Sequence, residues 1–402
     1  MTRLILTLNA GSSSLKFSVF EAGSDDPGLK ASGQVDRIGE APVMILKSPG
    51  QGRTEAGLKA VLGAEAHAAA LGSVLEALRQ TFPGSEVTAV GHRIVHGGAH
   101  RTEPVVLNDA ILTELEALSP FAPLHQPHNL SGIHAARAAF PEALQVGCFD
   151  TAFHRGHPWV HDTFALPRAF YDEGVRRYGF HGLSYDYIAG YLAQHHPDLH
   201  AGRVVVAHLG NGASMCGLRG GKSIASTMGF SAADGLPMGT RTGQLDPGVM
   251  LYLMQQKGMS AGEISDLIYK KSGLLGLSGL SNDMRTLEAS GTAEANEAIA
   301  YYCARIRREL GGLAAALGGI DALIFTGGIG ENSRHVRTEV CQDMGWIGIH
   351  LDPSANSENR EVVSTQDSSV RVMVIPTNEE LVIARATTKA VATRTSAGKA
   401  AE

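Results

Sequence analysis

Three glycine-containing turns each follow a run of apolar residues, and each has the composition of a phosphate-binding loop. They are residues 9–13, 208–212 and 326–332. Glycine lets the backbone approach an anion closely, and consecutive N–H groups then point at it. The third turn leads into a predicted helix, whose N-terminus favours negative charge. It has no Gly-Lys-Ser/Thr and is therefore not a Walker A loop. An ordinary polar hairpin explains any one turn, but three together favour a phosphate ligand.

Two arginines lie in settings that suit an anion. Arg93 follows Gly91 and His92, and Arg241 lies in the segment Gly239-Thr240-Arg241-Thr242-Gly243. Most surface arginines are simply solvated. An arginine flanked by glycine and short polar residues, however, has little against which its stem can pack. We interpret both as candidate clamps for an oxyanion.

Two carboxylates and two histidines complete the candidate set. Asp150 ends an apolar run, at the kind of strand end where α/β sites gather, although a cap of the next turn explains it equally well. Glu379 opens the last predicted helix, as a first-turn charge or as a ligand of Mg²⁺. His125 and His181 lie in turn-rich segments rather than on a helix face.

Composition limits the class of protein. The chain has 402 residues, of which 44% are hydrophobic and 18% charged, as expected for two or three folded domains. A net charge of −6 without a basic run argues against a nucleic-acid partner. No apolar run is long enough to span a bilayer, so we expect a cytoplasmic protein with no membrane partner. The four cysteines form no CxxC pair, which favours reduced thiols.

The elements that must position these residues are strands and helices in alternation. Strands are predicted over residues 4–8, 15–20, 30–36, 43–47, 87–91, 144–149, 203–209, 213–218, 321–325 and 370–375. Helices are predicted over residues 60–80, 109–118, 131–140, 184–194, 246–255, 262–269, 293–317 and 379–391. Residues 53–57 and 120–127 are predicted to be loops, the second because it holds three prolines. The tail beyond residue 392 is expected to fray.

A weak internal repeat joins the two halves of the chain. The strand–turn–strand pattern around Asn9-Ala10-Gly11 is echoed around Gly210-Asn211-Gly212, and a second unit begins near Thr151. Two related halves that each offer a phosphate turn would place a nucleotide between them.

With these residues in place, the chain resembles the acetate kinase family. The matching segments occur in the family's order between residues 9 and 381, so the resemblance extends over essentially the whole chain. They are 9–16, 92–98, 149–154, 177–182, 208–212, 238–241, 328–332 and 376–381. Several of them, such as Phe149-Asp150-Thr151-Ala152-Phe153-His154, are long and specific.

The resemblance implies a fold and a reaction. The fold is α/β, with two actin-like (ribonuclease H-like) domains whose mixed central sheets flank a nucleotide cleft. The first domain would comprise residues 1–150 and 383–402, with the last helix returning to it, and the second residues 151–382. Members are typically homodimers. The implied reaction is the reversible conversion of ATP and acetate to ADP and acetyl phosphate, with Mg²⁺ or, in its place, Mn²⁺.

The family's site residues fall on matching positions of this chain. The metal positions fall on Asn9 and Glu379, and the acyl-substrate arginine falls on Arg93. Asp150 matches the active-site aspartate, and His125 matches an active-site histidine. The transition-state stabilisers fall on His181 and Arg241. The nucleotide contacts fall on His208, Leu209, Gly210, Asn211, Gly212, Asp283, Met284, Arg285, Gly328, Ile329, Gly330, Glu331 and Asn332.

The chain departs from the family near the acyl group. Val95, Leu124 and Phe180 match walls of the acyl-methyl pocket, but Ala232 and Ala233 replace the usual Pro and Leu. A further departure is Leu183-Ser184-Tyr185 in place of Thr-Ser-His, and Gln126 replaces the usual Asn. A buried CH₂ is worth only about 0.8 kcal/mol, so a wider pocket would admit propionate without excluding acetate.

Two other functions compete with an acetate kinase. A propionate or butyrate kinase of the same family differs only in the volume of the acyl pocket. A non-catalytic actin-like ATPase module needs the nucleotide turns but has no use for Arg93, His181 and Arg241 together. Because a carboxylate is already an anion at neutral pH, the enzyme needs no general base; it must bring two anions together for in-line phosphoryl transfer.

Overall fold

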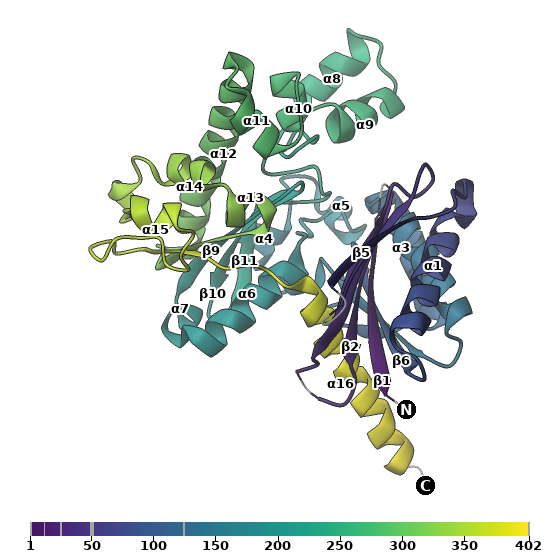
Figure 1. Ribbon diagram of the computed structural model, residues 1–402. Helices are drawn as coiled ribbons and strands as arrows, with labels where there is room; N and C mark the ends of the chain where they lie inside the picture. The colour runs from purple at the N-terminus through teal and green to yellow at the C-terminus, as the bar shows by residue number, and fades with distance from the viewer. Residues whose placement is uncertain (1, 12, 25, 49–51, 124, 401–402) are drawn as a thin grey trace. The chain divides into compact units, whose positions relative to one another are not determined.

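The computed structural model describes residues 2–11, 13–24, 26–48, 52–123 and 125–400 (Figure 1). The chain divides into two compact units. Unit 1 comprises residues 1–152 and 378–402, and unit 2 comprises residues 153–377. The last helix therefore belongs to the unit that begins the chain.

Unit 1 is built on one mixed sheet of eight strands, in the order β5-β4-β3-β2-β1-β6-β8-β7. The strands are β1 (Arg3–Ala10), β2 (Ser14–Glu21), β3 (Leu29–Asp36), β4 (Val43–Ser48), β5 (Gly52–Gly57), β6 (Glu86–Ile94), β7 (Val105–Val106) and β8 (Leu144–Phe149). β1 pairs antiparallel with β2 and parallel with β6, and β6 pairs parallel with β8. The parallel strands therefore bring the ends of β6 and β8 to the same edge.

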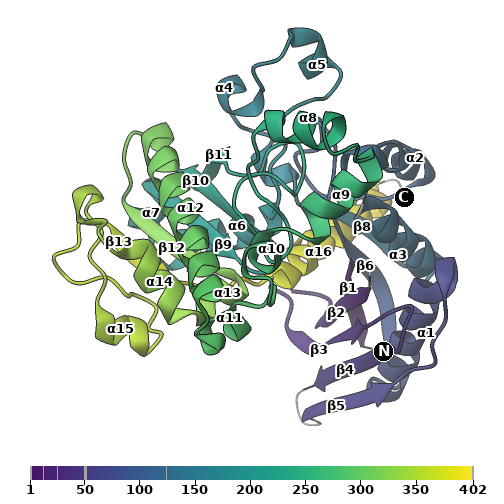
Figure 2. The ribbon, with the colours of Figure 1, turned by 90° about the horizontal axis from the view of Figure 1, so that it is seen from above.

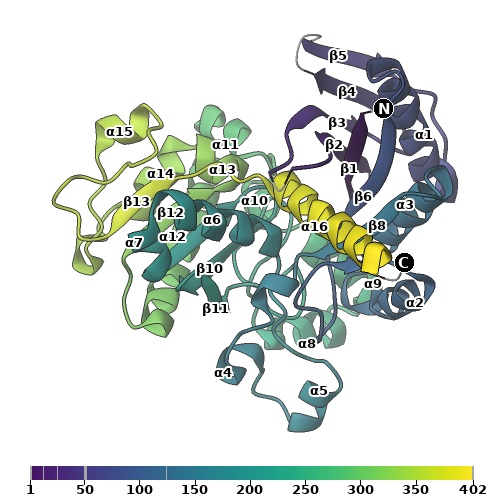
Figure 3. The same ribbon diagram turned by 90° about the horizontal axis from the view of Figure 1, so that it is seen from below.

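Helices cover both faces of this sheet. They are α1 (Ala66–Thr81), α2 (Asp109–Ala117), α3 (Gln126–Ala139) and α16 (Glu379–Ala400). Leu4, Leu6 and Leu8 of β1 share a core with α1, whereas Thr7, which points the opposite way, contacts α16. α16 lies along β6 (Figure 3), and a Cβ on Gly91 would come within 2.4 Å of Thr387. Gly91 therefore lets the last helix approach the sheet.

Unit 2 contains a five-stranded mixed sheet in the order β11-β10-β9-β12-β13 (Figure 2). The strands are β9 (Arg203–Leu209), β10 (Ala213–Arg219), β11 (Lys222–Ser226), β12 (Ala322–Thr326) and β13 (Arg371–Val374). Residues of α6 (Gly182–His195) pack on one face, against Val204 and Val206. Leu317 of α12 (Ala293–Leu317) approaches Gly217 on the other face.

The remaining helices of unit 2 are short. They are α4 (Trp159–Asp162), α5 (Arg168–Asp172), α7 (Pro197–Ala201), α8 (Pro247–Gln255), α9 (Ala261–Lys270), α10 (Gly273–Ser278), α11 (Met284–Ser290), α13 (Gly327–Asn332), α14 (Arg334–Cys341) and α15 (Pro353–Ser357). In the part of the chain that the structure describes, none of the helices is long and apolar enough to cross a membrane.

The two units repeat one topology. In unit 1 the neighbouring strands β3, β2, β1, β6 and β8 are paired antiparallel, antiparallel, parallel and parallel. The unit 2 strands β11, β10, β9, β12 and β13 have the same sequence of pairings. The echo between the β1–β2 and β9–β10 turns is therefore part of a repeat that extends over five strands of each sheet.

Three predicted elements were wrong in type or extent. Residues 53–57 form strand β5 rather than a loop; every residue of β5 is exposed, so its sequence lacks the apolar alternation of a half-buried strand. α3 begins at Gln126 and not after Ser131, because Pro127 lies in the first turn, where a missing N–H is tolerated. α16 continues to Ala400 beyond the predicted end at residue 391.

Smaller differences concern where helices begin. The predicted helix at residues 60–80 begins only at Ala66, after a short 3₁₀ turn. The third glycine turn is itself helical, as α13. All four cysteines are buried, and none forms a disulfide among the described residues.

Candidate active site

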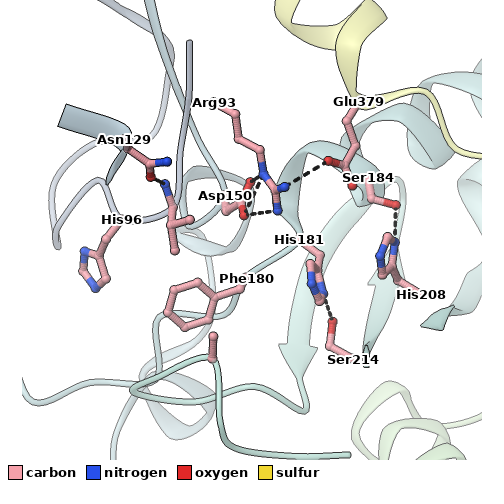
Figure 4. Close-up of polar contacts among 12 residues, drawn as sticks. Arg93, His96, Asn129, Asp150, Phe180, His181, Ser184, His208, Ser214 and Glu379 are labelled. Carbon is pink, nitrogen blue, oxygen red and sulfur yellow. Dashed lines mark hydrogen bonds and ion pairs between the residues drawn. The ribbon is translucent and has the colours of Figure 1, made fainter. Parts of the chain in front are cut away.

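Arg93 is the centre of a charged cluster in unit 1. It lies on β6 beside the end of β8, and its Nε and Nη2 donate to the carboxylate of Asp150 at 3.0 and 2.7 Å (Figure 4). Its third nitrogen, Nη1, lies 3.7 Å from Glu379 Oε2 at the start of α16. Asp150 is buried, while Arg93 and Glu379 retain 19% and 18% of their side-chain exposure. Asp150 therefore fixes the guanidinium plane, and Nη1 faces Glu379.

The charges of the cluster set its electrostatics. Burial lowers the pKa of Arg93, but the carboxylates of Asp150 and Glu379 outweigh that effect and raise the pKa above its usual value. Arg93 is therefore always a cation. Among Arg93, Asp150 and Glu379, one positive and two negative charges leave one net negative charge, which suits a divalent cation.

A second glutamate, which the sequence analysis missed, lies beside Glu379. Glu380 Oε2 accepts a 2.5 Å hydrogen bond from the hydroxyl of Thr7 on β1. Burial raises the pKa of Glu380 above its usual range and the charge of Glu379 adds to this, although the bond from Thr7 lowers it. Thr7 and Glu380 are 373 residues apart in the chain, so no local motif could have paired them.

Asn9 and Glu379 are the predicted metal ligands, and the structure allows this role. Asn9 and Thr7 are two residues apart on β1 and so share a face; Thr7 contacts α16, the helix that Glu379 opens. Amide and carboxylate oxygens are the ligands that Mg²⁺ prefers. No group of three potential His, Cys, Asp or Glu ligands occurs among the described residues. Phosphate oxygens and water would therefore have to complete the coordination.

Two buried amides shape the backbone beside Arg93: Asn129, which the sequence analysis did not single out, and Gln126, which it noted as a departure from the family. Asn129 donates to the carbonyl of Ala10 at 2.7 Å and accepts from the N–H of Val95 at 2.9 Å (Figure 4). Gln126 bonds both the N–H and the carbonyl of His96. These amides tie the segment after β6 to the β1–β2 turn and to α3.

One further predicted residue, His125, belongs to this region. His125 precedes α3 and its carbonyl accepts from the N–H of Asn129 at 3.0 Å. Leu124 lies outside the described residues. The structure therefore links His125 to Val95 through Asn129, and it brings Arg93, Asp150 and Glu379 together directly.

In unit 2, His181 is held by hydroxyl groups. Its Nδ1 lies 2.8 Å from Ser214 Oγ, and that oxygen lies 2.5 Å from the hydroxyl of Tyr185. His181 stacks on His208, with ring centroids 4.3 Å apart. His208 is bonded in turn to Ser184 at 2.8 Å (Figure 4). Neutral hydroxyl groups therefore orient His181 and His208.

Arg241 meets His181 above the β9–β10 turn. A Cβ on Gly212 would lie 3.1 Å from His181 Nε2 and 3.7 Å from Arg241 Nη1. Arg241 Nη1 also donates to the carbonyl of Ala232 at 3.0 Å. Glycine at position 212 therefore leaves room for two donors to converge, an arrangement suited to an anion.

The other predicted nucleotide segments also come close together. Gly210 lies near the N–H of Gly328, since a Cβ on Gly210 would be 3.9 Å from that nitrogen. Gly327 has φ +77°, and a Cβ there would collide with the backbone of Leu209. The Glu331 side chain accepts from the N–H groups of Gly327 and Thr377, which fixes the start of α13 against β13.

Arg337, which the sequence analysis missed, supports the end of α13. It is fully buried, and its Nη1 donates to the carbonyls of Gly330 and Glu331 at 2.8 and 3.0 Å. Burial lowers its pKa to about 10. A cation at a helix C-terminus is stabilising, so Arg337 holds the Gly328–Asn332 segment in place.

The predicted segment Asp283-Met284-Arg285 forms the start of α11. Asp283 caps the helix, and its carboxylate accepts from Arg285 Nε at 3.1 Å and Nη2 at 2.5 Å. Arg285 lowers the pKa of Asp283. Arg285 is 88% exposed, whereas Met284 is buried, so a ligand could reach only the charged pair of this segment.

Phe180 and the loop at residues 230–234 are held separately within unit 2. Phe180 is buried and its carbonyl lies 2.9 Å from His154 Nε2. Arg177 donates to Asp234 at 3.2 Å and to the carbonyl of Thr227. The loop that carries Ala232 is thus anchored by Arg177 on one side and by Arg241 on the other.

Comparison with known sequences identifies the relatives of this chain. The sequence pattern of the acetokinase family matches residues 4–385. An acetate kinase from Methylocella silvestris is 58% identical over 394 residues, which are 96% of this chain and 98% of the relative. An acetate kinase from Nitrobacter hamburgensis is 50% identical over 395 residues, which are 98% of this chain and 97% of the relative.

Solved structures agree with the sequences. The crystal structure of an acetate kinase from Porphyromonas gingivalis superimposes with a TM-score of 0.86 at 37% identity, covering 96% of this chain and 99% of that chain. A propionate kinase from Francisella tularensis gives a TM-score of 0.89 at 33% identity, covering 97% and 100%. The predicted actin-like fold is therefore confirmed.

Proposed function

The chain belongs to the acetokinase family and is a phosphotransferase that acts on a carboxylate, and from that premise we propose that it transfers the γ-phosphoryl group of ATP directly to acetate. The products are acetyl phosphate and ADP, and the reaction is reversible. The observation that carries the proposal is the likeness to acetate kinases along essentially the whole chain. The charged cluster in unit 1 and the paired donors in unit 2 support it.

Unit 1 supplies the groups for the acceptor and the metal. Arg93, with Nε and Nη2 held by Asp150, offers Nη1 to the acetate carboxylate. Val95 and Leu124 are assigned to the methyl group, and His125 to the surroundings of the site. Asn9 and Glu379 would hold Mg²⁺, or Mn²⁺ in its place, with phosphate oxygens and water completing the coordination. When bound, the metal neutralises charge on those oxygens.

Unit 2 supplies the groups for the nucleotide and for the phosphoryl group in transfer. His181 and Arg241 donate to its equatorial oxygens, where negative charge accumulates. Residues 208–212, 283–285 and 328–332 hold ATP. Phe180, which matches a wall of the acyl pocket in the family, is buried in unit 2. No proton needs to be removed from the acceptor, so the side chains only orient the substrates and stabilise charge.

The chain also gives reason to consider propionate as a second acceptor. Ala232 replaces a larger family residue, and its carbonyl holds Arg241. The propionate kinase of Francisella tularensis has a closely similar fold. We propose acetate as the main acceptor and propionate as a usable one. We further propose a cytoplasmic homodimer.

The proposal is tested by trapping acyl phosphates as hydroxamates with ATP, Mg²⁺ and a series of carboxylic acids. Wild type should give acetohydroxamate and, at a lower kcat/KM, propionohydroxamate. Arg241→Ala should lower kcat by about 10²–10³, as expected for loss of one transition-state donor. Formation of no acyl phosphate from any acid would refute the reaction, and equal kcat/KM for acetate, propionate and butyrate would refute the acetate assignment.

A further inference from the structure

Tyr185, Ser214 and His181 form a continuous chain of hydrogen bonds in unit 2. The Tyr185 hydroxyl lies 2.5 Å from Ser214 Oγ. The same oxygen lies 2.8 Å from His181 Nδ1 (Figure 4). Tyr185 and Ser214 are both fully buried, so their hydroxyl groups must find partners within the protein.

The order of donors in this chain follows from its chemistry. A serine hydroxyl has one proton and can donate to only one neighbour. The phenol of tyrosine is the more acidic of the two hydroxyls and hence the better donor. The distances allow either direction, and the acidity of the phenol favours Tyr185 as the donor to Ser214 and Ser214 as the donor to Nδ1 of His181. A neutral imidazole has one N–H, which then lies on Nε2.

Nε2 is the atom of His181 that approaches the β9–β10 turn. A Cβ on Gly212 would lie 3.1 Å from it and 3.7 Å from Arg241 Nη1. The hydrogen-bond chain therefore presents an N–H beside the guanidinium, at the place assigned to the transferring phosphoryl group. The opposite tautomer would present a lone pair to an anion.

The backbone and the core hold this arrangement in place. His181 has φ 57°, a left-handed conformation that is unfavourable for a residue with a side chain. The N–H of Tyr185 donates to the His181 carbonyl at 3.1 Å in the first turn of α6. The Tyr185 ring packs against Phe153 and His154 in the core. Tyr185 thus links the core of unit 2 to His181 through both backbone and side chain.

We propose that Tyr185 and Ser214 are positioning residues that hold His181 with its proton on Nε2 for the transferring phosphoryl group. The inference rests on the proposed function, because it requires His181 to donate to that group. It also assigns a role to a departure from the family, which commonly has histidine where this chain has Tyr185. Ser214 contacts no substrate in this account and acts only through His181.

A double-mutant cycle on kcat tests the proposal. Removal of a transition-state donor lowers kcat by about 10²–10³. Ser214→Ala leaves the His181 donor in place but less well oriented, so kcat should fall by a smaller factor, about tenfold. KM for ATP and acetate should change little. In a His181→Gln background, Ser214→Ala should have no further effect. An equal tenfold loss in both backgrounds would overturn the inference.

Matched variants separate positioning from packing. Tyr185→Phe should lower kcat in the same direction, and it replaces Ser214→Ala as the test if that variant does not fold. Tyr185→His, which keeps a donor for Ser214, should recover activity relative to Tyr185→Phe. Ser226→Ala is the control, because this buried serine on β11 has no hydrogen-bond partner among the described residues. A kcat loss in Ser226→Ala equal to that in Ser214→Ala would contradict the proposal.

The tautomer itself can be observed without activity. In ¹⁵N-histidine spectra at about pH 8, where histidine is neutral, the resonance missing from His181→Gln should report the Nε2–H tautomer. Ser214→Ala should shift it toward a mixture. If wild type forms no acyl phosphate, the proposed function fails while this spectrum still tests the positioning. An Nδ1–H tautomer in wild type would overturn the inference.

Discussion

The two sheets of this protein share a strand order but carry opposite chemistry at their strand ends. In unit 1, β6 and β8 end at Arg93 and Asp150, and α16 adds Glu379. In unit 2, the equivalent strands β12 and β13 end at Thr326 and Val374, and the hydrogen bonds around His181 and His208 come from the hydroxyl groups of Ser214 and Ser184. The contacts at the strand ends of unit 1 are therefore ionic, whereas those around the two histidines of unit 2 are neutral.

The difference shows how one topology supports two tasks. The repeat fixes where functional groups gather, since parallel strands end at one edge and hairpin turns lie beside them. The side chains then decide the ligand. An ionic cluster with one net negative charge favours a divalent cation, whereas Gly212 with two converging donors favours a phosphoryl group.

Removal of the buried Asp150 carboxylate should cause the largest loss of stability. Breaking a buried ion pair costs about 3–5 kcal/mol, and the partial exposure of Arg93 places Asp150→Ala at about 3 kcal/mol. Thermal and urea unfolding would measure the loss. The matched control is Arg285→Ala in unit 2, which breaks an Asp–Arg pair of similar geometry whose arginine is 88% exposed. It should unfold like wild type; an equal loss in both variants would show that burial does not distinguish the two pairs.

Arg93→Ala should weaken acetate binding more than it slows the chemical step. Hydrogen bonds to charged groups contribute about 1.5–3 kcal/mol, so KM for acetate should rise by about 10–100-fold. Steady-state kinetics with acetate and ATP varied separately would measure it. Arg93→Lys keeps the charge but not the bidentate contact with Asp150, and it should recover only part of the affinity. A rise confined to KM for ATP would contradict the assignment.

Buried neutral histidines should make both units sensitive to acid. Burial lowers the pKa of His92 in unit 1 and of His154 in unit 2 from 6.5 to about 4. A lowered histidine pKa means that the unfolded chain binds the proton first, so stability falls as pH decreases from 6.5 toward 4. By pH 5 each should contribute a loss of about 2 kcal/mol.

Urea unfolding at pH 7 and pH 5 would measure this loss. His92→Gln keeps a partner for Gln145, which His92 contacts at 2.8 Å, and it should flatten the pH dependence. A pH dependence unchanged in His92→Gln would show that His92 does not contribute. The effect should be specific to buried histidines, so the exposed His195 gives a control in His195→Gln.

Glu380→Gln should change the stability least, and it should stabilise the protein rather than destabilise it. Burial raises the folded-state pKa of Glu380. The stabilisation that Glu380 contributes is fully present below its unfolded-state pKa of 4.5, and it is lost as the pH rises through the folded-state pKa. The variant should therefore melt slightly above wild type at pH 8 and not at pH 4. A lower melting temperature at pH 8 would contradict the raised pKa.

The elements predicted most accurately are those with local signals in the sequence. The strand at 203–209 and the helix at 293–317 agree with the structure to the residue. That helix begins after a Thr292 cap and ends at Gly318 in the left-handed conformation, both visible in the sequence. β5 was missed because pairing with β4 leaves no buried face and hence no pattern in its side chains.

The candidate site likewise contains residues that the sequence predicted and partners that it did not. Arg93, Asp150 and Glu379 were each found from their settings, and the structure adds that they contact one another. Their partners were not predictable. Thr7 meets Glu380 across almost the whole chain, and Ser214 reaches His181 from a strand 33 residues away. Such contacts depend on the packing of elements that are distant in the sequence, and no local sequence pattern predicts them.

The central claim, that unit 1 binds the acceptor and unit 2 the nucleotide, is tested most directly by equilibrium binding of each ligand alone. Titration calorimetry with acetate and with ADP in the presence of Mg²⁺ would be applied to wild type, Arg93→Ala and Asn211→Ala. Arg93→Ala should lose affinity for acetate and keep that for ADP, and Asn211→Ala should show the reverse. Loss of both ligands in both variants, or the opposite assignment, would contradict the account.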